Sequence, residues 1–369
     1  MKLTIAKEQL LNGLQAVQNL VGSRTTLPIL SNVLLRAKEG MLELTATDLD
    51  VTVCCTVEAT VQKLGASTVP VKKLFGIARE LGAAQLEIEV DEKNGCKITA
   101  GSSYYRINGL AAEEFPPLPQ FADDRKFVLS QEKLKGMLRR TSFAVSSDET
   151  RYVLNGLFCS LKDHKVTLVA TDGRRLALTD EEADISAENE AEFIVPTKAI
   201  NELNRLLQPV GLVEIKVTEN QASFDLKGEK SLSALLITKL VEGSYPNYQQ
   251  VIPAESAERI ALVREELLQA LRRAEIMTSE KANSVKLAFT KNNLAITANS
   301  PDVGEARESL AVNYKGKDLS VAFNPAYLLD PLKALDCDEV FLELTDELSP
   351  GVLRTNGPFL YVIMPMRMS

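Results

Sequence analysis

The chain is a threefold internal repeat, and this repeat limits its possible folds more than any other feature of the sequence. Leu42, Leu44 and Ala46 alternate with polar residues at the period of a β-strand. The alternation returns 124 residues later at Val166, Leu168 and Ala170, and another 128 residues later at Leu294, Ile296 and Ala298. The 369 residues thus divide into three copies of about 123 residues each. Each copy is long enough to bury its own core, so we expect three similar domains.

Two helices are expected in every copy. Pro70, Pro196 and Pro325 keep the repeat spacing, and each opens a stretch with helical apolar spacing, as proline does in a first helical turn. An earlier amphipathic stretch also recurs. We therefore expect six helices, at residues 7–20, 70–81, 131–142, 197–207, 264–275 and 325–335. With strands between them the fold class is α+β, and turn-rich stretches place the domains at 1–122, 127–253 and 254–369.

The tripeptide Ala-Thr-Asp ends the alternating segment in the first two copies, at 46–48 and 170–172. In the first copy the apolar phase shifts at Asp48, from Leu44 and Ala46 to Leu49 and Val51, which requires a turn or a bulge. Aspartate favours turns because its carboxylate accepts hydrogen bonds from nearby backbone N–H groups. We therefore interpret Asp48 and Asp172 as turn residues. The alternative is an enzyme, such as a nuclease, that holds a metal with Asp48, Asp50 or Asp172.

Composition narrows the remaining classes of function. The net charge is −8, so any nucleic-acid contact has to be local. The five cysteines show no CxxC spacing, which predicts reduced thiols, and the single histidine, His164, excludes histidine-dependent catalytic triads. No apolar run approaches the length of a membrane span, and the N-terminus lacks a signal-peptide core. We expect a cytoplasmic protein without a metal or cofactor.

Positive charge gathers on the predicted helices. They sum to +6 and the rest of the chain to −14, which is typical of a protein that binds a phosphate backbone on one surface. The candidate phosphate contacts are Lys72, Lys73, Lys133, Lys135, Arg139, Arg140, Lys198 and Arg205. The chain has no tryptophan and no recognition-helix signature, so the contacts are expected to be with the backbone and through water. Solvated basic helix faces, or a repeat scaffold that binds only proteins, are the alternatives.

Several local strings resemble one family, the bacterial DNA polymerase III beta subunits, or sliding clamps. They are "RTTLPILSNVLL", "TATDLD", "YYRINGLAAEEFPPLP", "RYVLNGL", "ATDGRRLAL", "EGSYPNYQQVIP" and the terminal "YVIMPMR". The likeness spans the whole chain, and the strings are specific only in combination.

The resemblance implies a head-to-tail homodimer that closes into a ring, with helices lining the hole and antiparallel sheets outside. Such a ring encircles double-stranded DNA without reading its sequence and performs no chemistry of its own. It raises processivity by tethering the polymerase at high effective concentration. The implied partners are the clamp loader, the DNA polymerase III alpha subunit, and other polymerases or repair proteins that carry short clamp-binding peptides.

The resemblance also assigns site residues. Arg24, Tyr152 and the loop at 147–151, which includes Glu149, match positions that touch DNA in this family, and Val153 stands where some members have a second tyrosine. A cleft between the second and third domains takes the partner peptides. Its residues would be Leu154, Thr171, Gly173, Arg174, Arg175, Leu176, Pro246, Gln250, Val251, Leu348, Val362, Met364, Pro365, Met366 and Arg367. Gln250 replaces an arginine of some members, and Pro350–Gly351 changes a nearby loop.

The chain end "MPMRMS" supports this assignment from the residues themselves. Met364 and Met366 are flexible, polarisable side chains that can repack around different apolar ligands, and Pro365 stiffens the segment between them. We expect the ligand to be a short, mostly extended segment that bears glutamine and leucine or phenylalanine, with its apolar anchors beside Leu176, Val251 and Val362.

Overall fold

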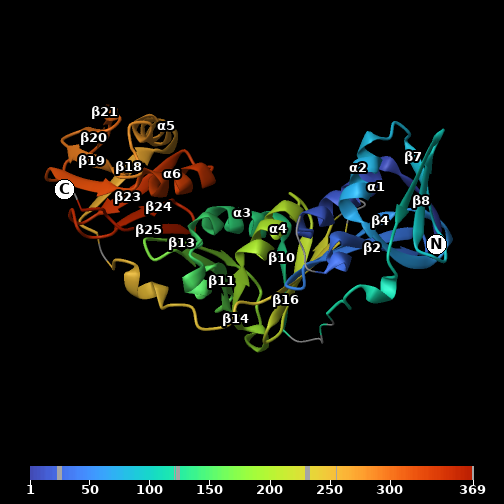
Figure 1. Cartoon of the computed structure of the whole chain (residues 1–369). Coiled ribbons are helices and arrows are strands. Elements are labelled where there is room, and N and C mark those ends of the chain that lie inside the picture. Colours follow the sequence, from blue (N-terminus) through green and yellow to red (C-terminus); the bar gives the residue numbers. More distant parts are fainter. Residues whose placement is uncertain (23–26, 120, 122–124, 229–232, 255, 368–369) are drawn as a thin grey trace. The chain divides into compact units, whose positions relative to one another are not determined.

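A computed structural model of the chain describes residues 1–22, 27–119, 121, 125–228, 233–254 and 256–367. The chain forms two compact units (Figure 1). Unit 1 consists of Met1–Lys135, Ile185–Ala191 and Lys198–Leu240, and unit 2 of Gly136–Asp184, Glu192–Thr197 and Val241–Ser369. The second predicted domain therefore shares its residues between the two units. The predicted α+β class with antiparallel sheets is confirmed.

Unit 1 contains two antiparallel sheets. In spatial order the smaller sheet consists of β5 (Thr60–Lys63), β1 (Lys2–Ala6), β7 (Gln85–Val90), β8 (Gly95–Ala100) and β9 (Ser103–Asn108). The larger one consists of β10 (Arg125–Ser130), β15 (Leu212–Val217), β16 (Gln221–Lys227), β17 (Ser233–Lys239), β4 (Val51–Glu58), β3 (Met41–Thr47), β2 (Asn32–Lys38) and β6 (Gly65–Pro70). The β17–β4 pair joins the second sequence copy to the first within one sheet.

Unit 2 repeats this arrangement. Its larger sheet consists of β14 (Ala191–Pro196), β11 (Gly156–Lys162), β12 (Lys165–Thr171), β13 (Arg175–Glu182), β25 (Phe359–Ile363), β24 (Gly351–Arg354), β23 (Glu339–Leu344) and β18 (Glu258–Val263). Its smaller sheet consists of β21 (Gly304–Ala311), β20 (Asn293–Ser300), β19 (Val285–Thr290) and β22 (Leu319–Phe323). Here the β13–β25 pair joins the second copy to the third.

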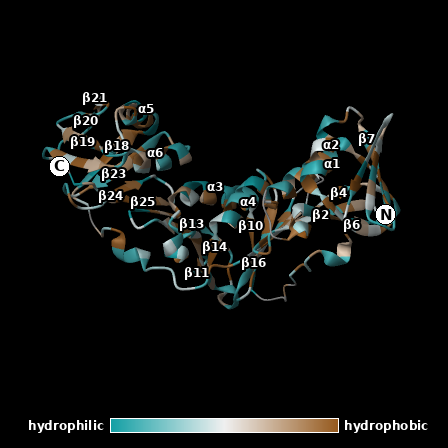
Figure 2. Ribbon diagram, viewed as in Figure 1, coloured by the Kyte–Doolittle hydropathy of each residue, from teal (hydrophilic) through white to brown (hydrophobic). Residues whose placement is uncertain are grey.

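All six predicted helices are present, within a few residues of their expected ends. They are α1 (Lys7–Val17), α2 (Val71–Glu80), α3 (Gln131–Thr141), α4 (Thr197–Leu206), α5 (Arg264–Glu275) and α6 (Pro325–Ala334). Their apolar faces close the cores, as Leu10 and Leu14 of α1 and Leu267 and Leu271 of α5 show by being almost fully buried. Figure 2 shows the same division, with hydrophobic residues in brown along the strands and hydrophilic residues in teal along the outer sides of the helices.

Two details of the sequence prediction are wrong. A strand precedes the first helix of every copy, at β1, β10 and β18, whereas the prediction began each copy with the helix. These strands run directly into their helices, so no turn cluster separates them. The one local signal is Ser130 at the end of β10, whose hydroxyl accepts from Lys133 N at 3.1 Å. Moreover, Pro70 and Pro196 end strands β6 and β14, and only Pro325 occupies a first helical turn, where Asn324 caps α6.

The surroundings of the cysteines and the histidine indicate structural roles for these residues. All five cysteines are free, and burial raises the pKa of Cys54 to about 11 and of Cys96 to about 12, so these thiols are not nucleophiles at neutral pH. His164 is an exposed turn residue of the β11–β12 hairpin, with a φ of 56°. Among the described residues, no helix is both long and apolar enough to span a bilayer.

Gly109 provides a test of how closely the first copy packs. Its N–H donates to the carbonyl of Asn94, and a Cβ at this position would lie 2.8 Å from that oxygen and closer still to the carbonyl of Thr68. Because both neighbours are backbone, Gly109→Ala should lower the free energy of unfolding by about 2 kcal/mol or more. Gly76→Ala is the matched control, since a Cβ on this residue of α2 meets nothing within 4 Å. Removing a helical glycine should raise stability by about 0.5–1 kcal/mol. Equal urea midpoints for the two variants would contradict the expected crowding.

Candidate functional site

The junction of β13 and β25 forms the floor of the candidate site in unit 2. Leu176 pairs with Val362 across this junction, and both side chains are 2% exposed. They belong to one hydrophobic cluster with Phe158, Val169, Ile194, Val352 and Leu360. The predicted cleft residues Leu176 and Val362 are therefore together in the structure, as buried support. Leu154 is also buried, with 9% exposure.

The segment between β17 and β18 crosses this cluster. The ring of Tyr245 stacks on that of Phe158 with centroids 5.0 Å apart, and Tyr248 lies tilted against the same ring at 5.9 Å. These contacts hold the segment that carries Pro246, Gln250 and Val251. Sequence reasoning missed the two tyrosines as anchors, although aromatic residues in a turn-rich connection were a visible signal.

Segments that adjoin this floor in the chain carry exposed apolar side chains, and we call these side chains the junction surface. Its exposed side chains are Val251 (48%), Leu348 (69%), Met364 (43%) and Met366 (38%). Backbone hydrogen bonds fix the two methionines, because Met364 N donates to Arg174 O at 3.0 Å and Met366 N to Ala322 O at 2.7 Å. Exposed apolar side chains that gather beside a strand end are typical of an interaction site.

The turn at 171–175 forms one wall of the site, and its aspartate has the predicted role. The Asp172 carboxylate oxygen Oδ1 accepts from the N–H groups of Arg174 and Arg175, at 2.9 and 3.0 Å. The Thr171 hydroxyl accepts from Gly173 N at 3.1 Å and donates to Arg175 O at 2.6 Å. Gly173 has a φ of 83°, a conformation that glycine adopts without strain.

The first copy builds the same turn atom for atom. Asp48 Oδ1 accepts from the N–H groups of Asp50 and Val51, and the Thr47 hydroxyl accepts from Leu49 N. Leu49 occupies the position of Gly173 with a φ of 79° and is 46% exposed, so it departs from the alternation expected of it. The prediction that Asp48 and Asp172 are turn residues is confirmed.

These bonds also weigh against the metal alternative. Burial acts to raise the pKa of Asp48, but hydrogen bonds from Lys198 and from two backbone N–H groups lower that pKa on balance. Asp50 pairs with Lys239 at 2.9 Å. In the part of the chain that the structure describes, no group of three or more His, Cys, Asp or Glu residues is placed to hold a metal ion.

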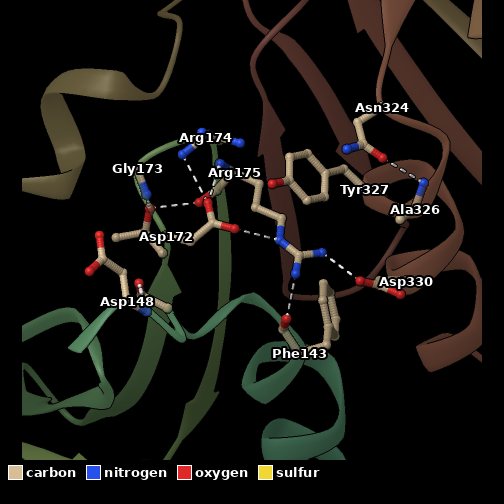
Figure 3. Close-up of polar contacts among 12 residues, drawn as sticks. Phe143, Asp148, Asp172, Gly173, Arg174, Arg175, Asn324, Ala326, Tyr327 and Asp330 are labelled. Atoms are coloured by element: carbon tan, nitrogen blue, oxygen red, sulfur yellow. Dashed lines mark hydrogen bonds and ion pairs between the residues drawn. The ribbon is translucent and has the colours of Figure 1, made fainter. Parts of the chain in front are cut away.

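Arg175, also predicted as a cleft residue, makes most of its polar contacts within the chain (Figure 3). Its guanidinium bonds Asp172 Oδ2 at 3.1 Å, Asp330 Oδ2 at 2.6 Å and the carbonyl of Phe143 at 2.8 Å. It also lies over the Tyr327 ring, 4.4 Å from the centroid. Asp330 and Tyr327 belong to α6, so Arg175 fastens the second copy to the third. Nothing in the sequence around Asp330 or Tyr327 signals this contact.

The loop before β11 carries the residues predicted to touch DNA. Asp148 caps it by accepting from Thr150 N at 3.0 Å and from the Thr150 hydroxyl at 2.6 Å. The hydrogen bonds from Thr150, and then that from Arg151, lower the pKa of Asp148. Tyr152 is 58% exposed, and Glu149 is exposed as well. Arg24 lies outside the described residues.

The predicted helix cations are mostly engaged with acceptors of their own chain. Arg139 pairs with Asp336, Arg140 with Glu181 at 3.1 Å, Lys198 with Asp48, and Arg205 with Glu202. Arg205 also donates to the carbonyl of Ala16 at 2.7 Å, and Lys135 to that of Leu207 at 2.9 Å. Lys72, Lys73 and Lys133 are exposed. The Arg139–Asp336 pair is exposed on both sides and therefore weak, so a phosphate can take the place of this carboxylate.

Loss of Arg175 should loosen the junction between the second and third copies. Arg175→Met keeps the volume but leaves Asp172 and Asp330 without their cation, which should lower the free energy of unfolding by about 2–3 kcal/mol. Urea unfolding measures the change. Arg125→Met, at an exposed arginine of β10, is the control for the loss of one positive charge. A variant as stable as the control would show that the Arg175 network contributes nothing.

Comparison with known proteins follows the same threefold division. The chain matches the DNA polymerase III beta subunit family in three parts: the N-terminal domain over residues 1–119, the central domain over 128–247 and the C-terminal domain over 249–367. It is 38% identical over 368 residues to the beta sliding clamp of Chlamydia pneumoniae, covering 100% of this chain and 99% of that one. It is 34% identical over 374 residues to that of Escherichia coli, covering 100% of both.

Solved structures give the same match. The sliding clamp of Bartonella birtlesii, bound to griselimycin, is 36% identical with a TM-score of 0.94, and that of Bacillus subtilis is 31% identical with a TM-score of 0.94. Each comparison covers 100% of both chains.

Proposed function

Since the chain belongs to the DNA polymerase III beta subunit family, the sliding clamps, we propose that two copies close head to tail into a ring around duplex DNA and hold partner proteins at the junction surface. Membership of the family makes the chain a three-domain clamp and a non-catalytic processivity subunit. The proposal concerns how this chain assembles and which of its residues meet DNA and partners.

A junction that occurs twice within the chain carries the ring proposal. Each time, the last strand of one copy pairs antiparallel with the strand that follows the Ala-Thr-Asp turn of the copy before it, as β17–β4 and as β25–β13. In the described residues, β9 and β21 are the corresponding strands that end their sheets without such a neighbour. A second copy of the chain would supply the missing neighbour to each, and closure would remove both free edges.

The two existing junctions define the register of the third. Thr238 of β17 pairs with Val51, and Ile363 of β25 pairs with Arg175. Ile107 is the equivalent of Thr238, because each pairs with the second residue of its neighbour strand, Cys96 of β8 and Ala222 of β16. Ile363 pairs in the same way with Gly351 at the start of β24. Gly304 opens β21 as Val51 opens β4 and Arg175 opens β13. We therefore expect Ile107 of one copy opposite Gly304 of the other.

This register gives complementary pairs. It sets Arg106 opposite Glu305, a cross-strand pair of opposite charge, and Tyr105 opposite Ala306. Tyr104 and Tyr105 are 60% and 41% exposed in the single chain, as befits residues that a second copy covers. Ile276, 70% exposed after α5, stands where Phe143 stands after α3, and Phe143 contacts Tyr361 across the internal junction. We expect Ile276 to be buried in the same way.

The hold on DNA follows from the helix cations. In our proposal Lys72, Lys73, Lys133, Lys135, Arg139, Arg140, Lys198 and Arg205 offer phosphates exchangeable partners, while Tyr152 and the loop at 147–151, which includes Glu149, touch the duplex from unit 2. Because such contacts read no base edges, the ring would bind any sequence and slide. The clamp loader, the polymerase alpha subunit and other clamp-binding proteins would share the junction surface through short peptides.

A charge exchange tests the ring and its register. Arg106→Glu should weaken the dimer through like charges opposite Glu305, and Arg106→Glu with Glu305→Arg should restore it. Sedimentation equilibrium should give twice the 40.5 kDa chain mass for the wild type and the double variant. After loading by the clamp loader, the wild type and the double variant should stay on circular DNA and leave linear DNA. The single variant Arg106→Glu should be retained less well on circular DNA.

Arg125→Glu, an equal charge change on β10, is the control and should leave the mass unchanged. A wild-type chain that stays monomeric at micromolar concentration would contradict the ring. A dimer that forms without retention on circular DNA would favour a scaffold that binds only proteins.

A second test addresses the junction surface. Met364→Lys places a charge among its apolar side chains while leaving the backbone bond from Met364 to Arg174 intact. A labelled peptide with glutamine, leucine and phenylalanine anchors should bind at least about tenfold more weakly, because an apolar contact is replaced by a buried charge. Met41→Lys is the matched control, since Met41 is an equally exposed methionine, at 48%, on β3. If both variants bind the peptide with equal affinity, Met364 does not contact the peptide.

A further inference from the structure

One side chain connects the loop at 147–154 with the turn at 171–175. The Arg151 guanidinium donates through Nε to Asp148 Oδ2 at 3.0 Å and through Nη1 to the carbonyl of Asp172 at 3.0 Å. The first bond fixes the arginine within its own loop. The second holds the turn that carries Gly173 and Arg174.

The turn is shaped to receive this guanidinium. A Cβ on Gly173 would lie 2.9 Å from Arg151 Nη1, so the missing side chain makes room for the cation as well as permitting the positive φ. Arg151 itself has φ −106° and ψ 56°, which kinks the short helix at Glu149–Leu154. A cavity of about 460 Å³ separates the loop from the turn, with Asp148, Arg151, Asp172 and Arg174 among its lining residues.

The same loop reaches the other wall of the junction surface. A Cβ on Gly243 would lie 3.3 Å from the Val153 side chain and 3.6 Å from the Tyr152 hydroxyl. Gly243 begins the segment that carries Tyr245, which the stacking on Phe158 holds. The loop that exposes Tyr152 is therefore in contact with both the turn and the crossing segment.

We propose that Arg151 is a positioning residue that links the DNA-facing loop to the partner-binding surface. It holds the turn at 171–175 in the form that receives a peptide, and it makes peptide affinity depend on what the loop contacts. This inference rests on the proposed function, since it assumes both ligands.

The hydrogen-bond donors of the Arg151 guanidinium determine whether DNA raises or lowers the affinity for the peptide. The two hydrogen bonds leave further N–H groups unused, and the side chain is 48% exposed. A DNA phosphate can thus bind Arg151 without displacing Asp148 or Asp172 O. It would then further order the loop and the turn, so that a peptide loses less conformational freedom on binding. Bound DNA should raise the affinity for the peptide, and bound peptide should raise the affinity for DNA by the same factor.

The test measures how tightly the chain binds a fluorescein-labelled peptide with glutamine, leucine and phenylalanine anchors. The affinity is measured with and without a saturating concentration of a short primed duplex. The full-length wild type should bind the peptide about fivefold or more tightly in the presence of DNA. Arg151→Met should lower the peptide affinity about threefold to thirtyfold in the absence of DNA. It should also abolish the increase in peptide affinity that DNA causes. Arg125→Met, the charge-matched control, should behave as the wild type does.

Further variants separate the possible failures. Asp148→Asn still accepts from Thr150 N and leaves the Arg151–Asp172 bond in place, so it should retain most of the peptide affinity. Thermal unfolding is recorded for each variant, and Arg151→Lys, which can reach one acceptor but not both, replaces Arg151→Met if the latter unfolds.

A wild type that binds no peptide contradicts the proposed function. A wild type that binds the peptide, together with an Arg151 variant of unchanged affinity and an unchanged response to DNA, contradicts only the link.

Discussion

The structure depends on backbone hydrogen bonding between the last strand of one repeat and the strand after the turn of the repeat before it. At β17–β4 and β25–β13 this pairing fuses sheets from neighbouring repeats, and side-chain contacts between the repeats are added to it. The Leu176–Val362 cluster lies on one such pair. In the part of the chain that the structure describes, the edges at β9 and β21 mark where this pairing stops.

The turn that precedes the pairing shows how one motif acquires two tasks. The backbone bonds of Asp48 and Asp172 are equivalent, but their second carboxylate oxygens serve different partners, Lys198 in the first copy and Arg175 in the second. In the first copy the ion pair itself crosses to the next repeat. In the second copy, Arg175 binds Asp330 of the third copy as well as Asp172. Gly173 and Arg174 of the same turn lie at the surface. The repeat thus supplies the same scaffold twice, and we propose that partners bind at the second of the two.

Local signals in the sequence were sufficient for the helices and for the turn aspartates, because apolar spacing and Asx hydrogen bonding act over a few residues. They were insufficient for contacts made by the tertiary fold. The partners Lys198 and Asp48 are 150 residues apart, and Arg139 and Asp336 are 197 apart. The resemblance assigned Arg175 to the peptide cleft, but its contacts with Tyr327 and Asp330 of another repeat had no signal in the sequence. The strands before each first helix were missed because no turn separates strand from helix.

The intrachain pairing of the helix cations changes how salt should act on a bound duplex. When a free lysine or arginine neutralises a phosphate, the ions condensed on the DNA are released, and affinity falls steeply with ionic strength. When Arg139 or Lys198 exchanges its own carboxylate for a phosphate, Asp336 or Asp48 is left to attract a cation from solution. The net release of ions is then small. If these side chains bind DNA as we propose, each contact exchanges one anion for another and depends little on ionic strength.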